Sequence, residues 1–320
     1  MGRGVLGCRL FKDRGPAAAK QPFFRSSRLA AAIAAAPLAG CTGVLTPHGP
    51  IGAAERLVLF DATAIMLAIV VPVIVAIAGF AWWFRHSNSR AFYWPNWEFS
   101  GTLELIIWSI PALVIVFLGG IAWFGSRALD PFLAIRGFEA IPVEVEVVAL
   151  DWKWLFIYPE EGIASVNTLA VPVGQPIHFR LTSSGVMNSF LVPELGTQIY
   201  EMARMTSQLY LQADEPGTYR GLSTNFSGDG FSGMRFEVRA MSADDYAKWL
   251  AEAKSSSAAL DRNAYAELVK PSENVPPTVY RAVEPGLFES IVNGTAPQPP
   301  PLNASAPSAE DVFAATCRGN

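Results

Sequence analysis

Two uninterrupted apolar stretches dominate the pattern of hydrophobic and polar positions in the first part of the chain. Residues 62–84 and residues 105–126 contain no charged side chain. Each stretch is long enough to cross the roughly 30 Å hydrocarbon core of a bilayer as a helix. The pattern therefore predicts a hairpin of two transmembrane helices within residues 57–126.

The short connection between the two stretches predicts their orientation. It carries Arg85, His86 and Arg90, and basic residues close to the ends of a span favour the cytoplasmic side. We therefore expect both ends of the mature chain to face away from the cytoplasm. Tryptophans gather near the ends of the stretches, as is typical of rings at the headgroup level. They are Trp82, Trp83, Trp94, Trp97 and Trp123.

A second pattern, in which apolar and polar residues alternate, follows the hairpin. It runs through residues 143–147, 177–182 and 234–238, and turn residues such as Pro216 separate the runs. Alternation with a period of two predicts half-buried strands of an antiparallel sheet or sandwich. The sequence thus predicts an all-β domain over residues 127–242.

Helical spacing returns after this β-rich region. Residues 243–254 and 261–270 each show it, which predicts a C-terminal helical region over residues 243–294. Proline, alanine and serine dominate residues 295–320. We expect that last segment to be a disordered tail, because it holds too few large apolar residues to build a core.

The first forty residues read as a targeting segment. Arg25 and Arg28 precede an alanine-rich run, and a Leu-Ala-Gly triplet stands directly before Cys41. This order resembles a bacterial lipoprotein signal, so we expect residues 1–40 to be removed, Cys41 to be acylated and residues 41–56 to form a periplasmic N-terminus. The alternative is a short membrane helix with an incidental cysteine, but roughly a dozen apolar residues are too few to span a bilayer.

Composition narrows the classes of function. Of the 320 residues 51% are hydrophobic and 16% charged, which favours a membrane component. The formal net charge of −4, without a basic stretch, argues against nucleic acid as a partner. Cys8, Cys41 and Cys317 are the only cysteines, so no disulfide framework is available to the β-rich domain.

One acid lies at the cytoplasmic threshold of the second apolar stretch. Glu104 precedes Trp108 and Pro111 in "LELIIWSIP". An ionisable residue just inside the hydrocarbon boundary is costly unless it meets water or a partner, so Glu104 is a candidate for proton or ion traffic. A boundary acid that only reaches out to water is an equally weighted alternative, and Asp61 fits that alternative better.

The aromatic run "DWKWLFIYP" begins at Asp151. Trp152 and Trp154 are candidates for electron transfer within it. Packing of the β-rich domain is the more economical interpretation of the same residues.

A glycine-rich loop and a second short segment carry the remaining candidate chemistry. The loop reads "STNFSGDGFSGM" over residues 223–234, and the segment reads "NSFLVP" from Asn188. With the two helices and the β-rich domain, they make the chain resemble subunit II of the heme-copper respiratory oxidases from Cys41 to about Leu250. The resemblance implies two transmembrane α-helices followed by an all-β cupredoxin-like sandwich, with additional C-terminal helices.

In the copper-containing branch of that family, two motifs hold a dinuclear copper centre. They are His-Ser-Phe-x-Val-Pro and Cys-x-x-x-Cys-x-x-x-His-x-x-Met, with a backbone carbonyl between the cysteines. This chain has asparagine in place of the first histidine, serine in place of both cysteines and phenylalanine in place of the second histidine, and it keeps only the methionine. The corresponding positions are Asn188, Ser223, Ser227, Phe231 and Met234, with Asn225 between the two serines.

These replacements remove the ligands, because a mixed-valence copper pair needs thiolate bridges and imidazoles. We therefore expect no metal and no cofactor in this chain. Met234 is in register with Phe236, which favours a packing role in the core. We expect close packing around Phe226, Phe231 and Met234, with the serine hydroxyls bonded to the loop backbone.

The replacements match the copper-less branch of the family, the cytochrome bo-type ubiquinol oxidases. The segments "DWKWLFIYPE", "VMNSFLVPELGTQIY", "EPGTYRG" and "FSGMRF" are similar to that branch. The resemblance implies a non-catalytic subunit II of a proton-pumping enzyme complex in the bacterial inner membrane, with its C-terminal domain in the periplasm. Glu104, in Glu-x-x-x-Trp-x-x-Pro, matches the family's glutamate at the mouth of the K proton pathway into subunit I.

The resemblance also implies the partners. They are the lipid bilayer, further membrane subunits, and subunit I, which carries the hemes and copper, oxidises ubiquinol and reduces dioxygen to water. No soluble cytochrome c is expected. Two other classes stay open, namely a copper-containing cytochrome c oxidase subunit II and a membrane-anchored lipoprotein that serves as a binding or assembly module. Stoichiometric copper would favour the first, and purification without a heme-containing subunit would favour the second.

Overall fold

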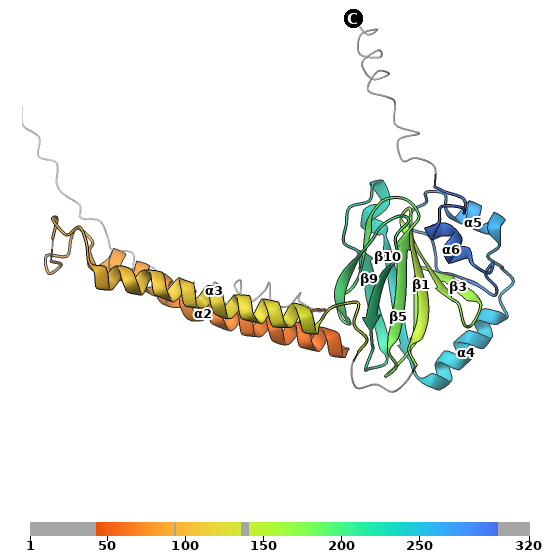
Figure 1. Cartoon of the computed structure of the whole chain (residues 1–320), viewed down its shortest axis with the longest axis horizontal. Coiled ribbons are helices and arrows are strands. Elements are labelled where there is room, and N and C mark those ends of the chain that lie inside the picture. The colour runs from red at the N-terminus through yellow and green to blue at the C-terminus, as the bar shows by residue number, and fades with distance from the viewer. Residues whose placement is uncertain (1–42, 93, 136–140, 300–320) are drawn as a thin grey trace, which may run out of the picture. The chain divides into compact units, whose positions relative to one another are not determined.

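A computed structural model of the chain describes residues 43–92, 94–135 and 141–299. Two long helices come first, α2 (Pro50–Trp83) and α3 (Gly101–Ala128) (Figure 1). By length and composition both helices can cross a membrane, which agrees with the predicted hairpin. The predicted signal segment, Cys41 and the end of the tail from residue 300 lie outside the described residues.

The outer domain is a sandwich of two sheets, as predicted. One sheet has six strands in the order β11-β3-β2-β1-β5-β8, and the other has five in the order β4-β10-β9-β6-β7. Most neighbours are antiparallel, but β1 pairs with β5 and β4 pairs with β10 in parallel. The strands are β1 (Val143–Leu150), β2 (Lys153–Tyr158), β3 (Ile163–Val166), β4 (Thr168–Pro172), β5 (Ile177–Ser183), β6 (Asn188–Val192), β7 (Gly196–Glu201), β8 (Ser207–Leu211), β9 (Gly217–Ser223), β10 (Arg235–Met241) and β11 (Thr278–Tyr280).

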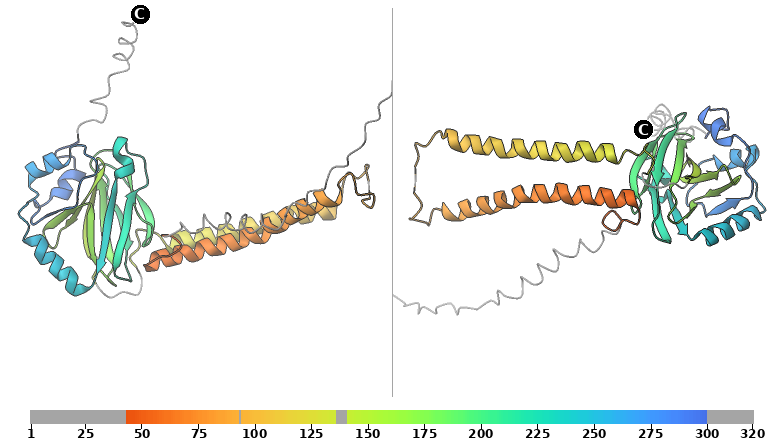
Figure 2. Two further views of the ribbon diagram at one scale, coloured as in Figure 1. Left: turned by 180° about the vertical axis from the view of Figure 1, so that it is seen from behind. Right: turned by 60° about the horizontal axis from the view of Figure 1, so that its bottom comes forward.

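Three helices belong to the C-terminal region: α4 (Ala243–Lys254), α5 (Arg262–Leu268) and α6 (Leu287–Val292). The N-terminus of α4 is capped by Ser242, whose hydroxyl accepts the amide of Asp245, and that of α5 by Asp261. In both views of Figure 2 the blue C-terminal helices lie on one side of the sandwich. In Figure 1 α5 and α6 lie beside β1 and β3.

The outer domain has two hydrophobic cores. The first lies between the sheets and is rich in aromatic side chains, with Trp154, Phe156, Phe179, Phe190 and Phe236. Ring centroids 5.1–5.5 Å apart connect these five in one cluster. The second core lies between the other face of the six-stranded sheet and the C-terminal region. It contains Leu155, Ile157, Tyr265, Leu287 and Phe288.

Residues before α2 are tied to the sandwich by backbone hydrogen bonds. His48 donates to the carbonyl of Glu194 at 2.7 Å and accepts from the amide of Asp214 at 2.8 Å. Gly52 donates to Leu195 at 3.0 Å. After α3, the carbonyl of Pro131 accepts the amide of Tyr210 at 3.2 Å. The chain is thus bonded to the sandwich on entering and on leaving the hairpin.

Candidate functional site

The glycine-rich loop joins β9 to β10 in the five-stranded sheet. Ser223 is the last residue of β9, a short 3₁₀ helix spans Asp229–Gly233, and Met234 stands directly before β10. The amide of Ser223 donates to the carbonyl of Met234 at 3.2 Å. The two ends of the loop are therefore held together, and the positions between them form a compact turn beside β6.

The first two positions of the copper pattern meet at the buried side of this loop. Asn188 opens β6, which pairs with β9, and the Ser223 hydroxyl lies 3.3 Å from Asn188 Oδ1 and 3.3 Å from the carbonyl of Asn225. Asn188 Nδ2 donates to the carbonyl of Val186 at 3.1 Å. Asn188 and Ser223 are only 1% and 3% exposed. Their polar atoms are thus occupied by each other and by backbone.

The other two buried positions also pair with each other. The Ser227 hydroxyl lies 3.9 Å from the sulfur of Met234, and both residues are buried. Met234 is part of the sandwich core, as its register predicts. The expectation that serine hydroxyls bond the loop backbone therefore holds for Ser223, while Ser227 contacts a thioether instead.

Trp152 packs against the glycine-rich loop. Its indole nitrogen donates to the carbonyl of Ser227 at 3.1 Å. A Cβ added to Gly230 would lie 2.5 Å from the Trp152 ring, so only glycine allows this approach. Trp152 itself has φ of 65°, a left-handed conformation that few bulky residues adopt. Trp152, the first tryptophan of the aromatic run, thus packs under the loop, in agreement with the packing interpretation.

One expected packing residue is misplaced. Phe226 is 74% exposed, so the prediction that it would be closely packed beside Met234 is wrong. It touches only the rim of the loop, where its ring meets the half-buried Phe231 edge-on at 5.7 Å. The physical reason is that the hydrogen bonds of Ser223 and Asn225 already close the loop, and Phe226 lies beyond them at its tip.

The side chains at these positions do not fit a dinuclear copper centre. They offer an amide, two hydroxyls, a thioether and an aromatic ring, and no thiolate or imidazole. A serine hydroxyl stays protonated near neutral pH, so it cannot bridge two copper ions. Over the whole described part of the chain, no three His, Cys, Asp or Glu side chains come close enough to hold a metal ion.

Glu104 lies in the first turn of α3, three residues after the helix begins. Its backbone amide donates to the carbonyl of Ser100 at 3.0 Å. An acid in the first turn is favoured by the helix dipole, and Glu104 and Trp108 are both exposed on the helix surface. This geometry suits a boundary acid and leaves the carboxyl free to face a partner chain.

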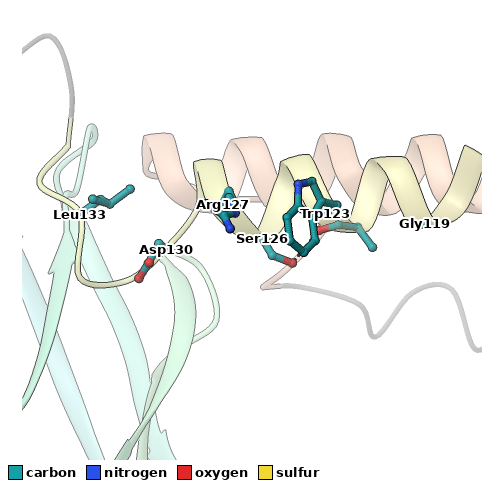
Figure 3. Close-up of a pocket in the computed structure, with 7 residues that line it drawn as sticks. Gly119, Trp123, Ser126, Arg127, Asp130 and Leu133 are labelled. Carbon is teal, nitrogen blue, oxygen red and sulfur yellow. Dashed lines mark hydrogen bonds between the residues drawn. The ribbon is translucent and has the colours of Figure 1, made fainter.

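The end of α3 and the turn that follows enclose a hollow of about 630 Å³ (Figure 3). Arg127 lies over the Trp123 ring with its guanidinium carbon 4.7 Å from the ring centroid. Asp130 accepts the amide of Phe132 at 3.0 Å. A cation and an indole at the end of an apolar helix are typical anchors at the headgroup level of a membrane. The lining residues are Gly119, Ala122, Trp123, Ser126, Arg127, Asp130 and Leu133.

Comparison with known proteins decides the family. Residues 143–241 match the family described as "Cytochrome C oxidase subunit II, periplasmic domain", and residues 254–295 match the "COX Aromatic Rich Motif". The chain is 48% identical over 256 residues to the cytochrome bo(3) ubiquinol oxidase subunit 2 of Pseudomonas aeruginosa, covering 80% of this chain and 77% of that one. The chain belongs to the ubiquinol oxidase subunit 2 family.

A second ubiquinol oxidase subunit agrees with this assignment. The chain is 48% identical over 270 residues to ubiquinol oxidase subunit 2 of Acetobacter aceti, covering 84% of this chain and 88% of that one. The periplasmic domain of subunit II of cytochrome oxidase from Bradyrhizobium japonicum aligns with 22% identity and a TM-score of 0.34, over 35% of this chain and 94% of that one. Family membership makes the chain a membrane-anchored subunit of a quinol oxidase, which assembles with partner subunits.

Three features of this oxidase subunit have no counterpart in the sequence-based predictions. Lys153 is almost fully buried and reaches the carbonyl of Lys270 at 2.7 Å. Glu201 is fully buried at the end of β7. Apart from Ile141, the exposed large apolar side chains of residues 141–299 lie on β7, in the segments before β6 and after β7, or in the β9–β10 loop. They are Met187, Tyr200, Met202, Met205 and Phe226.

Proposed function

We propose that the chain is the non-catalytic subunit II of a proton-pumping ubiquinol oxidase, and that its outer domain carries no dinuclear copper centre. In this proposal subunit I holds the hemes and copper, oxidises ubiquinol and reduces dioxygen. The observation that carries the proposal is the paired set of Asn188 with Ser223 and Ser227 with Met234. Each polar atom there is engaged by a neighbour, and none is a thiolate or imidazole.

Quinol as electron donor fits an outer domain of this kind. Quinol is a membrane-soluble reductant, so electrons enter the complex from the bilayer and no soluble cytochrome has to be met at the outer surface. The outer domain then has a structural role in the assembly of the complex, and a closed, hydrogen-bonded loop is compatible with that role.

Copper analysis of the purified full-length subunit, separated from subunit I, tests this proposal. We expect the outer domain of the full-length chain to bind no stoichiometric copper and to show no near-infrared absorption. The matched positive control is a variant with the donors restored, Asn188→His, Ser223→Cys, Ser227→Cys and Phe231→His. Stoichiometric copper in the unmodified subunit would contradict the proposal.

We propose further that Glu104 takes up protons at the cytoplasmic side for delivery to subunit I. Its support is an exposed carboxyl at the start of α3 and the rule that an acid at the hydrocarbon boundary needs water or a partner. Glu104→Ala should slow turnover or proton uptake while assembly stays intact. The control is Glu98→Ala, which changes an exposed acid in the connection between α2 and α3. Unchanged rates in a well-assembled Glu104→Ala complex would contradict this role.

The exposed apolar side chains around β6 and β7 supply a docking surface in this proposal. We define the apolar rim as Met187, Tyr200, Met202, Met205 and Phe226. The side-chain amide of Asn225 donates to the carbonyl of Met187 at 3.0 Å, so the loop tip and the segment before β6 are connected. Soluble surfaces rarely gather large apolar side chains in this way except where another chain binds. Subunit I is the partner we propose for the apolar rim.

The membrane topology in this proposal follows from the sequence. Residues 1–40 act as a lipoprotein signal for the inner membrane, Cys41 is acylated, and the sandwich lies in the periplasm. Mass spectrometry of the mature N-terminus tests the anchor. A mature chain that begins elsewhere than at Cys41 would contradict it.

A further inference from the structure

Glu201 is a buried acid in the five-stranded sheet. It is the last residue of β7 and is 0% exposed. Neither of its carboxyl oxygens has a hydrogen-bond partner among the described residues. Its cross-strand neighbour in β6 is Asn188, the first position of the copper pattern. A buried acid whose oxygens accept no hydrogen bond among the described residues therefore lies next to Asn188, beside the glycine-rich loop.

The strands and turns packed around Glu201 supply no charge to it. β6 has no ionisable side chain, and the residue opposite Glu201 is an amide that already bonds Val186 and Ser223. The titratable groups of the neighbouring elements have partners elsewhere or lie exposed. In β5 they are His178, on Glu144, and Arg180, on Glu146 and Glu289. In β8 and β9 they are Tyr210, stacked on His178, Tyr219, on the carbonyl of Glu215, and the exposed Arg220. In the turn after β7 the guanidinium of Arg204 lies beside Gly294. In α2, which packs on β7, Glu55 bonds the side chain of Thr197 and Arg56 bonds the carbonyl of Leu45.

An isolated ionised carboxylate is very costly to bury, so the group is held neutral in the closed structure. Burial raises the pKa of Glu201 well above its ordinary value, and desolvation is the cause. When the surrounding segment opens to water, the same group returns to an ordinary carboxyl with a pKa of about 4.5. The closed form therefore binds one more proton than the open form over the pH range between the two values.

Glu201 lies in a segment at the edge of the sandwich, so its protonation affects how that segment is packed. β7 is an edge strand of the five-stranded sheet, and its pairing with β6 is irregular between Phe190 and Val192. After it, the chain is held to the other sheet by a contact of the Thr182 hydroxyl with the carbonyl of Met202 at 3.4 Å and by a bridge between Ser183 and Ala203. Opening this edge breaks the pairing of β7 with β6 and the bond from the Ser207 hydroxyl to the carbonyl of Tyr200, and it leaves the rest of the five-stranded sheet paired.

We propose that Glu201 makes the packing of residues 196–206 proton-dependent, so that this edge of the sandwich is tightly closed when Glu201 is protonated and opens more often as the pH rises. Tyr200 and Met202 flank Glu201 and belong to the apolar rim, so the same proton controls how firmly part of that rim is held. The inference concerns the packing of this chain and does not depend on what docks there.

The sign and size of the effect follow from linkage. Because the closed form binds one more proton, its stability against local opening falls as pH rises from about 4.5 toward the raised pKa of Glu201. One proton changes the opening constant about tenfold per pH unit in this window. Below the window both forms are protonated, and the opening constant no longer depends on this group.

Hydrogen exchange of the full-length chain in detergent, read by mass spectrometry, tests the proposal. Protection factors of peptides covering residues 196–206 are measured from pH 5 to pH 8 after correction for the intrinsic exchange rate. We expect them to fall as the pH rises in the unmodified chain, by at most about tenfold per pH unit where the pH lies between 4.5 and the raised pKa of Glu201. They should be nearly independent of pH in Glu201→Gln and in Glu201→Met, of which the second also removes the unpaired polar atoms.

The exposed Glu160, changed to glutamine, is the matched control and should keep the slope of the unmodified chain. Protection factors of residues 196–206 that do not change with pH in the unmodified chain would overturn the proposal. An unchanged slope in both Glu201 variants would also overturn it, because the proton would then reside on another group.

Discussion

The two sheets of the outer domain differ in how many of their faces are covered. In the five-stranded sheet β10 alternates between buried and exposed residues along its whole length. In the six-stranded sheet every residue of β2 and β3 is buried. β10 thus faces one core, whereas β1, β2 and β3 have a core on each side. Within the five-stranded sheet β4 is the strand that is fully buried, and α4 packs beside it.

The difference explains what the C-terminal region is for. Leu155 and Ile157 point away from the sandwich core and pack against Tyr265, Leu287 and Phe288. Without that cover the strands around "DWKWLFIYP" would expose a broad apolar face to water. The region matched by the aromatic-rich motif is therefore a structural layer of the domain.

The largest expected effect tests this second core. Phe288 is 2% exposed and carries the Arg180 guanidinium 4.9 Å above its ring. Phe288→Ala should lower the free energy of unfolding of the outer domain by about 3–5 kcal/mol, the usual cost of removing a buried phenylalanine. Urea unfolding of the full-length chain in detergent, followed by tryptophan fluorescence, measures it.

The matched change in the first core is Phe190→Ala, since Phe190 is fully buried between the sheets. Comparable losses would mean that the two cores form one cooperative unit. If Phe288→Ala costs less than about 1 kcal/mol, the C-terminal region is an appendage and the comparison between the sheets fails.

The alternation of residues predicted the half-exposed strands of both sheets well, as in β5 and β10, and the fully covered strands less well. The alternating run at residues 234–238 became β10, with Phe236 and Val238 buried. The run at residues 143–147 became part of β1, but Glu146 in its polar register is covered too, because Arg180 bonds it at 2.8 Å. A pattern of single residues cannot show that a second layer will cover the polar face.

The length of a helix or strand decided most of the other predictions of secondary structure. Residues 243–254 were predicted as helical and form α4 with those bounds. β11 has three residues and α6 has six, and such short elements leave no readable period. Both are fixed by contacts distant in sequence, β11 by pairing with β3 and α6 by the second core.

The candidate site shows the same limit. The resemblance to the copper motifs implied that these positions belong to one site, and the structure pairs Asn188 with Ser223 and Ser227 with Met234. The resemblance could not place Phe226, whose exposure depends on the hydrogen bonds that close the loop. Glu201 had a readable signal that was missed: it falls in the inward register of β7 with Ile199, where an acid breaks the apolar pattern.

The second expected effect concerns the link between the two layers. Lys153 is 1% exposed, and its ammonium group donates to the carbonyl of Lys270 and the hydroxyl of Ser272. Lys153→Met should cost about 1–3 kcal/mol of unfolding free energy at pH 7, because both acceptors lose a charged donor. Urea unfolding at matched pH measures it. Ser272→Ala, which removes one acceptor only, should cost less.

The pH dependence sharpens this test. Burial lowers the pKa of Lys153 to about 8 from its ordinary 10.5. Between these values the unfolded chain binds more protons than the folded chain, so the stability contributed by this group rises with pH. The difference in unfolding free energy between the unmodified chain and Lys153→Met should therefore widen above pH 8. A constant difference from pH 7 to pH 10 would show that Lys153 titrates as if exposed.

The smallest effect on stability is expected where the five-stranded sheet meets solvent. Phe226 is 74% exposed at the loop tip, so Phe226→Ala should change the unfolding free energy of the isolated subunit by less than about 0.5 kcal/mol. If the apolar rim docks on subunit I, the same change should reduce the fraction of subunit that co-purifies with the heme-containing partner. Phe132→Ala, an exposed phenylalanine outside the rim, controls for loss of apolar surface alone. Full recovery of the complex with Phe226→Ala and with Met205→Ala would remove the rim from the interface, because the side chains that project furthest from it would then contribute nothing to binding.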